Sequence, residues 1–209
     1  VALDLAARGH EVVALDRDPA LLAAARERAG TLPLATAQAD MRDFDLGRRF
    51  GLILVPMQTV QLLAGPEERA RFLRCARRHA APGARVAMAL ADPFEGMSPS
   101  DEPHELPLPD LLEIGDVVYA SQPIAVRDVP GATEIERIRQ RVGADGSVER
   151  TPDVVRVTAL APATLEAEAA GAGFSAAPRQ AVAPTPDHVG STVVVVTAPS
   201  ARAATVAAP

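Results

Sequence analysis

The sequence predicts an α/β fold with a mostly parallel β-sheet, and three observations support this. In the first ninety residues, short β-branched runs alternate with amphipathic helical runs, which is typical of βαβ units. Between residues 115 and 158, alternating apolar and polar segments are separated by turn residues, which predicts an antiparallel meander. A helical run and the apolar segment TVVVVT then follow. We therefore expect a parallel core carrying an inserted antiparallel β cap.

The elements of the core are predicted from caps and apolar spacing. Residues 1–9 look like the end of a helix that closes on Gly9, and Asp18-Pro19 supplies an N-cap and first helical residue for the next helix. The predicted strands are 10–16, 34–39, 50–55, 85–91, 174–182 and 192–197, and the predicted helices are 19–29, 66–80 and 163–172. We assign residues 1–91 and 159–197 to the core.

The inserted region is expected to span residues 92–158. Its first part, 92–112, is rich in Pro, Ser, Asp and Glu and is longer than most loops of compact domains, which is typical of a lid or binding segment. Strands are predicted over 115–126, 133–142 and 148–158. The last twelve residues, 198–209, have little large apolar surface and are expected to be disordered.

Composition excludes several classes of function. The 209 residues include no lysine, so a P-loop, a pyridoxal Schiff base and a Tyr/Lys dehydrogenase pair are ruled out. One cysteine and four dispersed histidines predict neither a disulfide nor a metal site. A net charge of −6 with few aromatic residues disfavours long nucleic acids as partners. No apolar run is long enough for a membrane helix, so we expect a cytoplasmic protein that binds small molecules.

Two acidic residues follow predicted strands at the edge where parallel sheets bind ligands. Asp16 comes directly after the strand 10–16 and is placed to accept the hydrogen bonds of a ribose diol. Helix capping is the alternative, but Asp18 already supplies the cap. Asp40, followed by Met41, is placed to accept from an adenine amine while Met41 packs on the ring, although a polar turn with Arg42 is the alternative.

Other polar residues have structural interpretations. The arginines of the helix 66–80 are expected on a solvated face, and Cys75 is expected to be a small buried side chain. Tyr119 and His188 are candidates to contact the substrate, as a proton acceptor or an orienting group. A structural role is the more common one for such residues.

At this point the sequence resembles the class I S-adenosylmethionine-dependent methyltransferases of the small-molecule type. The resemblance lies in HEVVALDRDPALLAAARERA, QADMRDFDL, FGLILVPMQTVQLL and FLRCARRHAAPGARVAMALADP, and with the closing helix and strand it covers about two-thirds of the chain. It implies a Rossmann-like, doubly wound sheet and S-adenosylmethionine as cofactor. The implied cofactor-binding residues are Asp16, Arg17, Asp40, Met41 and Pro56; Gln58, Gln61 and Tyr119 are candidates for substrate binding, and no metal is implied.

The first strand and glycine-rich turn of that family have no counterpart in the sequence before Val1. We therefore expect a sheet that lacks its first strand, weak cofactor binding by this chain, and exposed strand edges that would allow association, a homodimer included.

The resemblance implies transfer of a sulfonium methyl group to a nucleophile on a small molecule by in-line displacement. Positioning and desolvation would supply most of the catalysis, so no universal base is expected and the catalytic residues are left open. An NAD(P)-dependent oxidoreductase would also use Asp16 and is one alternative. A degenerate, non-catalytic binding module is the other.

Overall fold

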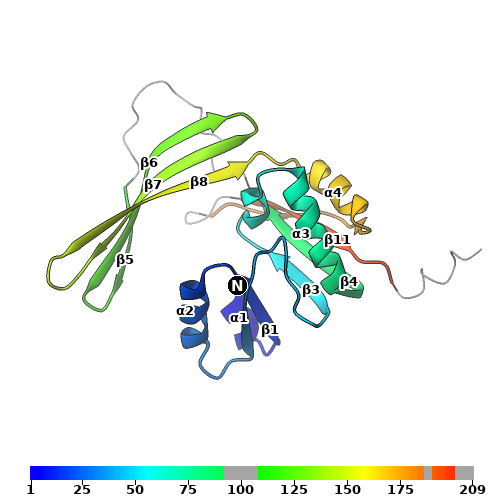
Figure 1. Ribbon diagram of the computed structural model, residues 1–209, viewed down its shortest axis with the longest axis horizontal. Helices are drawn as coiled ribbons and strands as arrows, with labels where there is room; N and C mark the ends of the chain where they lie inside the picture. The colour runs from blue at the N-terminus through cyan, green and yellow to red at the C-terminus, as the bar shows by residue number, and fades with distance from the viewer. Residues whose placement is uncertain (92–107, 186–189, 201–209) are drawn as a thin grey trace, which may run out of the picture.

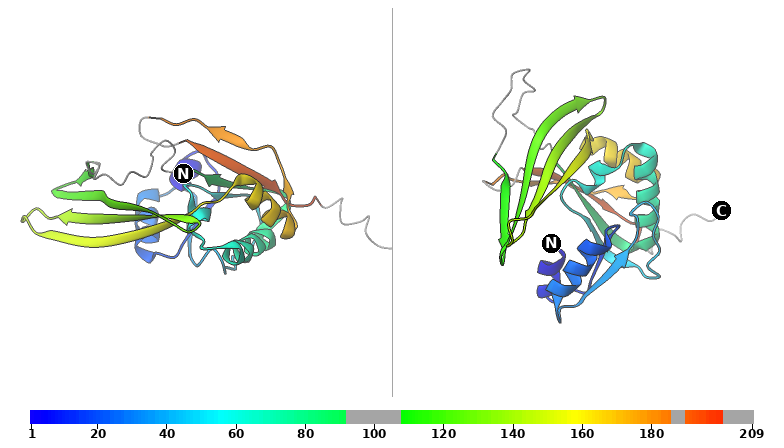
Figure 2. Two further views of the ribbon diagram at one scale, coloured as in Figure 1. Left: turned by 90° about the horizontal axis from the view of Figure 1, so that it is seen from above. Right: turned by 60° about the vertical axis from the view of Figure 1, so that its left-hand side comes forward.

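The computed structural model describes residues 1–91, 108–185 and 190–200. Its elements fall into three groups, each with its own sheet (Figure 1). The first 40 residues form a small αβαβ unit, a larger mixed sheet with two helices forms the core, and a long antiparallel sheet extends away from both (Figure 2). This is the Rossmann-like α/β architecture that the sequence predicts.

The first unit is built from local signals in the sequence. Its elements are α1 (Ala2–Ala7), β1 (Val12–Asp16), α2 (Pro19–Ala29) and β2 (Leu34–Gln38). Asp18 caps α2 as predicted, since its Oδ1 accepts the Ala20 N–H at 2.7 Å. Gly9, at φ 86°, ends α1 in the left-handed conformation that favours glycine. β1 and β2 pair in parallel from Val12↔Leu34 to Asp16↔Gln38.

The core sheet has the order β10-β11-β4-β3, with β9 pairing to β11. Its elements are β3 (Phe50–Val55), η1 (Thr59–Leu62), α3 (Pro66–His79), β4 (Ala80–Leu90), α4 (Pro162–Gly171), β9 (Ser175–Ala176), β10 (Gln180–Val182) and β11 (Ser191–Thr197). β3 and β4 are parallel, and β11 returns antiparallel to β4. β11 therefore lies inside the sheet, between β10 and β4.

The hydrophobic core lies between this sheet and the helices α3 and α4. Alternate side chains of β4 and β11 point into it, and α3 and α4 contribute Leu73 and Leu165, which are fully buried. The other largest fully buried residues are Met88, Val60, Val86, Val194, Val196 and Cys75. Cys75 is thus a small buried side chain, as predicted.

The two parallel strand pairs do not join. Within the described residues, β1 pairs only with β2 and β3 pairs only with β4, so the inner edges of β1 and β3 face each other without a strand between them. Leu52 and Leu54 of β3 keep 51% and 39% of their side-chain surface exposed, although such residues are normally buried in a parallel sheet. This is the arrangement expected for a sheet that lacks one strand.

The inserted sheet has four antiparallel strands in the order β5-β6-β7-β8, which are β5 (Asp110–Ile114), β6 (Val117–Val129), β7 (Ala132–Val142) and β8 (Val148–Thr158). The structure adds β5 to the three strands that the pattern predicts. Residues 92–107, most of the predicted lid segment, lie outside the described residues.

Three boundaries differ from the prediction. β4 begins at Ala80 directly after α3, and the strand expected over 174–182 is divided into β9 and β10. The chain also stays packed beyond β11, because Ala198 is buried and its N–H donates to the Ala84 carbonyl at 2.8 Å. The predicted disorder from residue 198 is therefore wrong at its start, and residues 201–209 lie outside the described part. No helix among the described residues combines the length and hydropathy needed to cross a bilayer.

Candidate functional site

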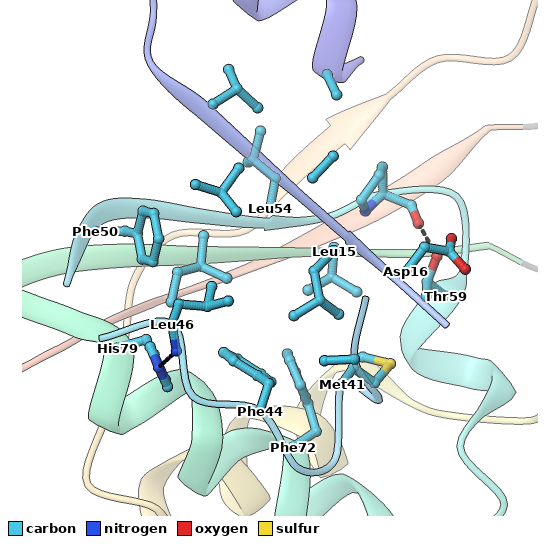
Figure 3. A pocket seen from close by; sticks show the side chains of 18 of the residues that line it. Leu15, Asp16, Met41, Phe44, Leu46, Phe50, Leu54, Thr59, Phe72 and His79 are labelled. Carbon is cyan, nitrogen blue, oxygen red and sulfur yellow. Dashed lines mark hydrogen bonds between the residues drawn. The ribbon is translucent and has the colours of Figure 1, made fainter. Parts of the chain in front are cut away.

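A cavity of about 770 Å³ opens between β1 and β3, where their two unpaired edges face each other (Figure 3). Its walls are formed by the two facing strand edges, and the segment that follows β2 completes it. Every residue that the sequence predicts for cofactor binding lines this cavity: Asp16, Arg17, Asp40, Met41 and Pro56. The fold thus brings together side chains from three successive strand ends, as expected at the carboxyl edge of a parallel sheet.

Asp16 stands at the end of β1, half-buried at the mouth of the cavity. Its Oδ1 accepts the Asp18 N–H at 2.9 Å, which fixes the carboxylate in a turn that leads into α2. Behind it, the Gln38 Nε2 donates to the Arg17 carbonyl at 3.3 Å and links the ends of β2 and β1. One carboxylate oxygen therefore holds the loop, and the other is oriented by that contact.

Asp40, after β2, is held by an arginine. The Arg42 Nε donates to Asp40 Oδ1 at 2.9 Å and the Arg42 Nη2 donates to Oδ2 at 2.6 Å, while the other end of Arg42 pairs with Glu68. These hydrogen bonds from Arg42 lower the pKa of Asp40 to about 2. Glu68 in turn accepts the Ala64 N–H at 2.8 Å. The network connects the Asp40 side of the cavity to the start of α3.

The deeper part of the cavity is apolar. Figure 3 shows Leu15, Phe44, Phe72 and Leu54 around it, and Met41 packs both on the cavity and on the hydrophobic core. Much of this apolar lining belongs to the unpaired strands β1 and β3, whereas the charged groups follow the strand ends. The aromatic residues were missed by reasoning from sequence, because neither lies at a strand end.

The segment after β3 makes a strained turn beside the cavity. Thr59 N–H and Thr59 Oγ1 both donate to the Pro56 carbonyl, at 3.2 and 2.7 Å. The two central residues, Met57 and Gln58, have φ angles of 55° and 61°, which non-glycine residues rarely adopt. Met57 nevertheless keeps 84% of its surface exposed. Strain of this kind is concentrated at functional sites.

The candidate substrate residues are placed differently from the cofactor residues. Among the described residues, those that line the cavity do not include Gln58, Gln61 or Tyr119. Gln58 is in the strained turn, and Tyr119 lies on β6 with 41% of its surface exposed. Gln61 is buried, and its amide bonds to two backbone groups, the Thr158 carbonyl and the Ala91 N–H. His188 lies outside the described residues.

One interpretation of α3 is revised by the structure. Arg69 was expected on a solvated face with Arg71, Arg74, Arg77 and Arg78, but it is buried and forms a two-point ion pair with Glu168 at 2.7 Å for each contact. The prediction is therefore wrong for Arg69, because α4 covers that side of α3. His79 is also buried: its Nε2 accepts the Leu46 N–H at 3.0 Å and its Nδ1 lies 2.8 Å from the Cys75 carbonyl.

No cluster of His, Cys, Asp and Glu in the described residues has the arrangement of a metal site. The site therefore consists of carboxylates, an arginine network and an apolar cavity.

Comparisons with known proteins place this geometry in a family context. Residues 1–83 match the family model described as a methyltransferase domain. The sugar N-methyltransferase KedS8 from Streptoalloteichus is similar over 90% of this chain and 71% of its own, with 22% identity and a TM-score of 0.65. DesVI from Streptomyces venezuelae shares 24% identity over 90% of this chain and 74% of its own, with a TM-score of 0.65.

A third solved structure is that of CalS10, an amino pentose methyltransferase from Micromonospora echinaspora with S-adenosylmethionine bound. It shares 24% identity over 90% of this chain and 73% of its own, with a TM-score of 0.61. No curated protein matches the sequence. At these identities the solved structures establish a shared fold, and the family match covers the part of the chain that contains Asp16 and Asp40.

Proposed function

We propose that this chain is a class I S-adenosylmethionine-dependent methyltransferase, since residues 1–83 match a methyltransferase domain, and that the cavity between β1 and β3 binds the cofactor through the residues predicted from sequence. The single observation that carries this proposal is that Asp16, Arg17, Asp40, Met41 and Pro56 come from separate segments and line one cavity. When bound, the cofactor supplies a methyl group on a sulfonium that is already an activated leaving group.

The residues present fit the adenosine part of this cofactor. Asp16 is oriented by the Asp18 N–H so that its carboxylate is available to a ribose diol at the end of β1. Asp40 is held ionised by Arg42, which suits an acceptor for the adenine amine, and Met41 beside it offers a polarizable surface for the ring. Asp40 Oδ2 already accepts a hydrogen bond from Arg42 Nη2 at 2.6 Å, so an adenine amine would share this oxygen with the arginine. The adenine contact would therefore form beside that ion pair.

We propose an amine on a sugar-like small molecule as the methyl acceptor. The support is that KedS8 is described as a sugar N-methyltransferase and CalS10 as an amino pentose methyltransferase. The acceptor would lie between the turn at residues 56–59 and the inserted sheet, with Gln58 and Tyr119 as the predicted contacts. An amine nucleophile needs only to be neutral and aligned with the methyl group, so the contribution of the protein is positioning and exclusion of water.

The first test is a ligand-observed NMR titration with S-adenosylhomocysteine, which detects affinities as weak as about 1 mM, or roughly −4 kcal/mol. We expect binding by the chain and loss of the signal in Asp16→Asn, which keeps the shape of the side chain but removes its charge. Asp116→Asn, in the exposed turn before β6, is the matched control and should bind like the unaltered protein.

The same titration with NAD⁺ separates the oxidoreductase alternative. Binding of NAD⁺ in place of S-adenosylhomocysteine would contradict the proposed cofactor, and binding of neither would favour a non-catalytic module. Methylation of a panel of amino sugars, followed by mass spectrometry, then tests the acceptor class, and modification of hydroxyl groups alone would contradict the amine assignment.

We also propose that the chain forms a homodimer. The support is β5, an edge strand of the inserted sheet on which Leu111, Leu112 and Ile114 are 59–65% exposed. Sedimentation velocity of the unaltered chain and of Leu112→Glu checks this: the unaltered chain should sediment as a dimer and the variant as a monomer, and a monomer in both cases would contradict it.

A further inference from the structure

Gln61 joins three separate parts of the molecule. It lies in η1, 5% exposed, and both ends of its side-chain amide are bonded to backbone groups. Its Oε1 accepts the Ala91 N–H at 3.0 Å, and its Nε2 donates to the Thr158 carbonyl at 3.1 Å. The amide group therefore has its donor and acceptor sides occupied at the same time, which fixes its orientation.

The two backbone partners mark the two junctions of the inserted region. Ala91 follows the last residue of β4, where the chain leaves the core, and Thr158 is the last residue of β8, where it returns. In Figure 1, β8 runs from the inserted sheet to the core and ends beside the segment that follows β3. Gln61 therefore contacts the chain both where it leaves the core and where it returns from the inserted sheet.

A second hydrogen bond reinforces the return junction. Thr158 Oγ1 donates to the Leu63 carbonyl at 2.9 Å, so the end of β8 is held to the η1 segment by its side chain as well as by its backbone carbonyl. The rest of the sheet contacts the core less closely: its strands pair with one another, and most of β5 and β8 is exposed. The orientation of the sheet consequently depends on these few junction contacts.

We propose that Gln61 is a positioning residue that fixes the angle between the inserted sheet and the core. The amide does this because each of its bonds holds one junction, and losing either bond leaves a buried polar group without a partner. The proposal rests on the proposed function in one respect only. If the acceptor lies between the 56–59 turn and the sheet, Gln61 also sets the width of that acceptor site without touching the acceptor.

The test is Gln61→Glu, because protonation restores the original bonding pattern. A protonated carboxyl group donates to the Thr158 carbonyl and accepts from the Ala91 N–H, as the amide does. An ionised carboxylate has no proton to donate and places negative charge against the Thr158 carbonyl. Burial and that carbonyl both raise the pKa of the new carboxyl group above the ordinary glutamate value of about 4.3. A shift in the angle of the sheet should therefore appear at pH 8 and disappear at pH 5.

The angle is measured by pulsed electron–electron spin resonance between nitroxide labels. The labels are attached at Arg71→Cys on α3 and Glu149→Cys on β8, both exposed positions, in a Cys75→Ala background. With Gln61 present, we expect one narrow distance distribution at both pH values. With Gln61→Glu, we expect a distribution at least twice as broad at pH 8 and the narrow one again at pH 5. Because a buried carboxylate would also lower the stability of the whole fold at pH 8, circular dichroism at that pH must show that the variant is folded.

The matched control is Gln38→Glu. The Gln38 amide also donates to a backbone carbonyl, that of Arg17, but it lies on β2 outside the junction. This substitution should leave the distance distribution unchanged at both pH values. A narrow, unchanged distribution for Gln61→Glu at pH 8 would overturn the positioning role, and so would broadening that persists at pH 5.

The failure of the proposed function would give a different result. If the sheet shifts in Gln61→Glu at pH 8 but the KM for an amino-sugar acceptor stays the same, the positioning role stands and the acceptor site lies elsewhere. If both proposals hold, the KM rises at pH 8 by at least fivefold relative to the unaltered protein, while the Kd of S-adenosylhomocysteine stays within twofold.

Discussion

At the scale of single residues, the site depends on how a few polar groups hold one another. Arg42 contacts Asp40 through two side-chain hydrogen bonds and contacts Glu68 through its other amino group, whereas the sequence predicts it only as part of a polar turn. The structure shows that the arginine organises the position at which the adenine contact is proposed. Its effect on Asp40 leads to a prediction about acid stability.

Replacing Arg42 by Met should reduce stability and flatten its dependence on pH. The folded pKa of Asp40, about 2, is below the unfolded value, so Asp40 stabilises the fold above the unfolded pKa, and this contribution is lost as the pH falls through about 2. Because Asp40 is partly exposed, we expect its contribution to be about 1 kcal/mol rather than the full value of the shift. Urea unfolding between pH 2 and 6 measures it.

Arg48→Met is the control for Arg42→Met, because Arg48 pairs with Glu11 at the surface, where both side chains are mostly exposed. It should change the pH profile little. An Arg42→Met profile that runs parallel to that of the unaltered protein would contradict the role of the pair.

Replacing Met57 by Gly should stabilise the protein, which is unusual for this substitution. Met57 has φ 55° and is largely exposed, so glycine removes the left-handed strain and loses little packing. After the entropy cost of glycine, we expect a gain of roughly 0.5 kcal/mol in the free energy of unfolding. Methylation of the acceptor should fall at the same time, because the turn beside the cavity becomes more flexible.

Leu62→Gly is the matched comparison for Met57→Gly. Leu62 is 51% exposed and lies in η1, where no positive φ is required, so glycine should destabilise the protein there. Both variants are compared by thermal unfolding. A loss of stability in Met57→Gly as large as in Leu62→Gly would show that the turn is not strained.

At the scale of elements, α3 and α4 are joined by a buried ion pair. Arg69 and Glu168 keep only 6% and 16% of their side-chain surface exposed, and one guanidinium nitrogen, Arg69 Nη1, has no partner in the described residues. A buried ion pair of this kind makes a protein little more stable than a pair of well-packed apolar residues would. Removing only one partner is nevertheless strongly destabilising, because the other charge stays buried.

Arg69→Met should therefore destabilise the protein by about 3 kcal/mol, since it leaves the Glu168 carboxylate buried and unpaired. The double variant Arg69→Met/Glu168→Met should recover at least half of that loss. Chemical denaturation of both single variants and the double variant completes the cycle. If the losses of the single variants simply add in the double variant, the two side chains are not coupled and the interpretation of the pair is wrong.

At the scale of the whole molecule, the β1–β2 sheet and the core sheet should differ in stability. β1 and β2 form a two-stranded sheet with α1 and α2, whereas β3, β4 and β11 belong to a sheet that is covered by α3 and α4 over a continuous core. Two-stranded sheets are marginally stable on their own. We expect the amides of β1 and β2 to exchange with deuterium at least tenfold faster than those of β4 and β11.

Hydrogen exchange monitored by mass spectrometry measures this difference. Adding S-adenosylhomocysteine should slow exchange in β1 and in residues 39–42, because binding the cavity joins the two sheets through a common ligand. Equal exchange in both sheets without ligand would show that they unfold as one unit, which the unpaired edges of β1 and β3 do not predict.

Much of the fold follows from the sequence because its signals are local. Asp18-Pro19 caps α2, Gly9 ends α1, and β-branched runs mark β1, β3 and β11, all within a few residues of the structure that they specify. The residues proposed for cofactor binding were predictable for the same reason: they stand at or just after strand ends, and parallel strands place their carboxyl ends at one edge. Their convergence on a single cavity was implied by the order of the strands.

The tertiary structure alone decided the contacts between distant segments. Arg69 meets Glu168 across 99 residues, and Gln61 meets Thr158 across 97, so no periodicity in the sequence could distinguish these polar residues from exposed ones. Whether a side chain is solvated or buried depends on which element covers it, and that is settled only when α4 packs on α3 and β8 returns to η1. The sequence by itself determined the elements and the ligand-binding edge of this protein. Packing determined which polar groups hold those elements together, because burial and pairing arise only between surfaces that folding brings into contact.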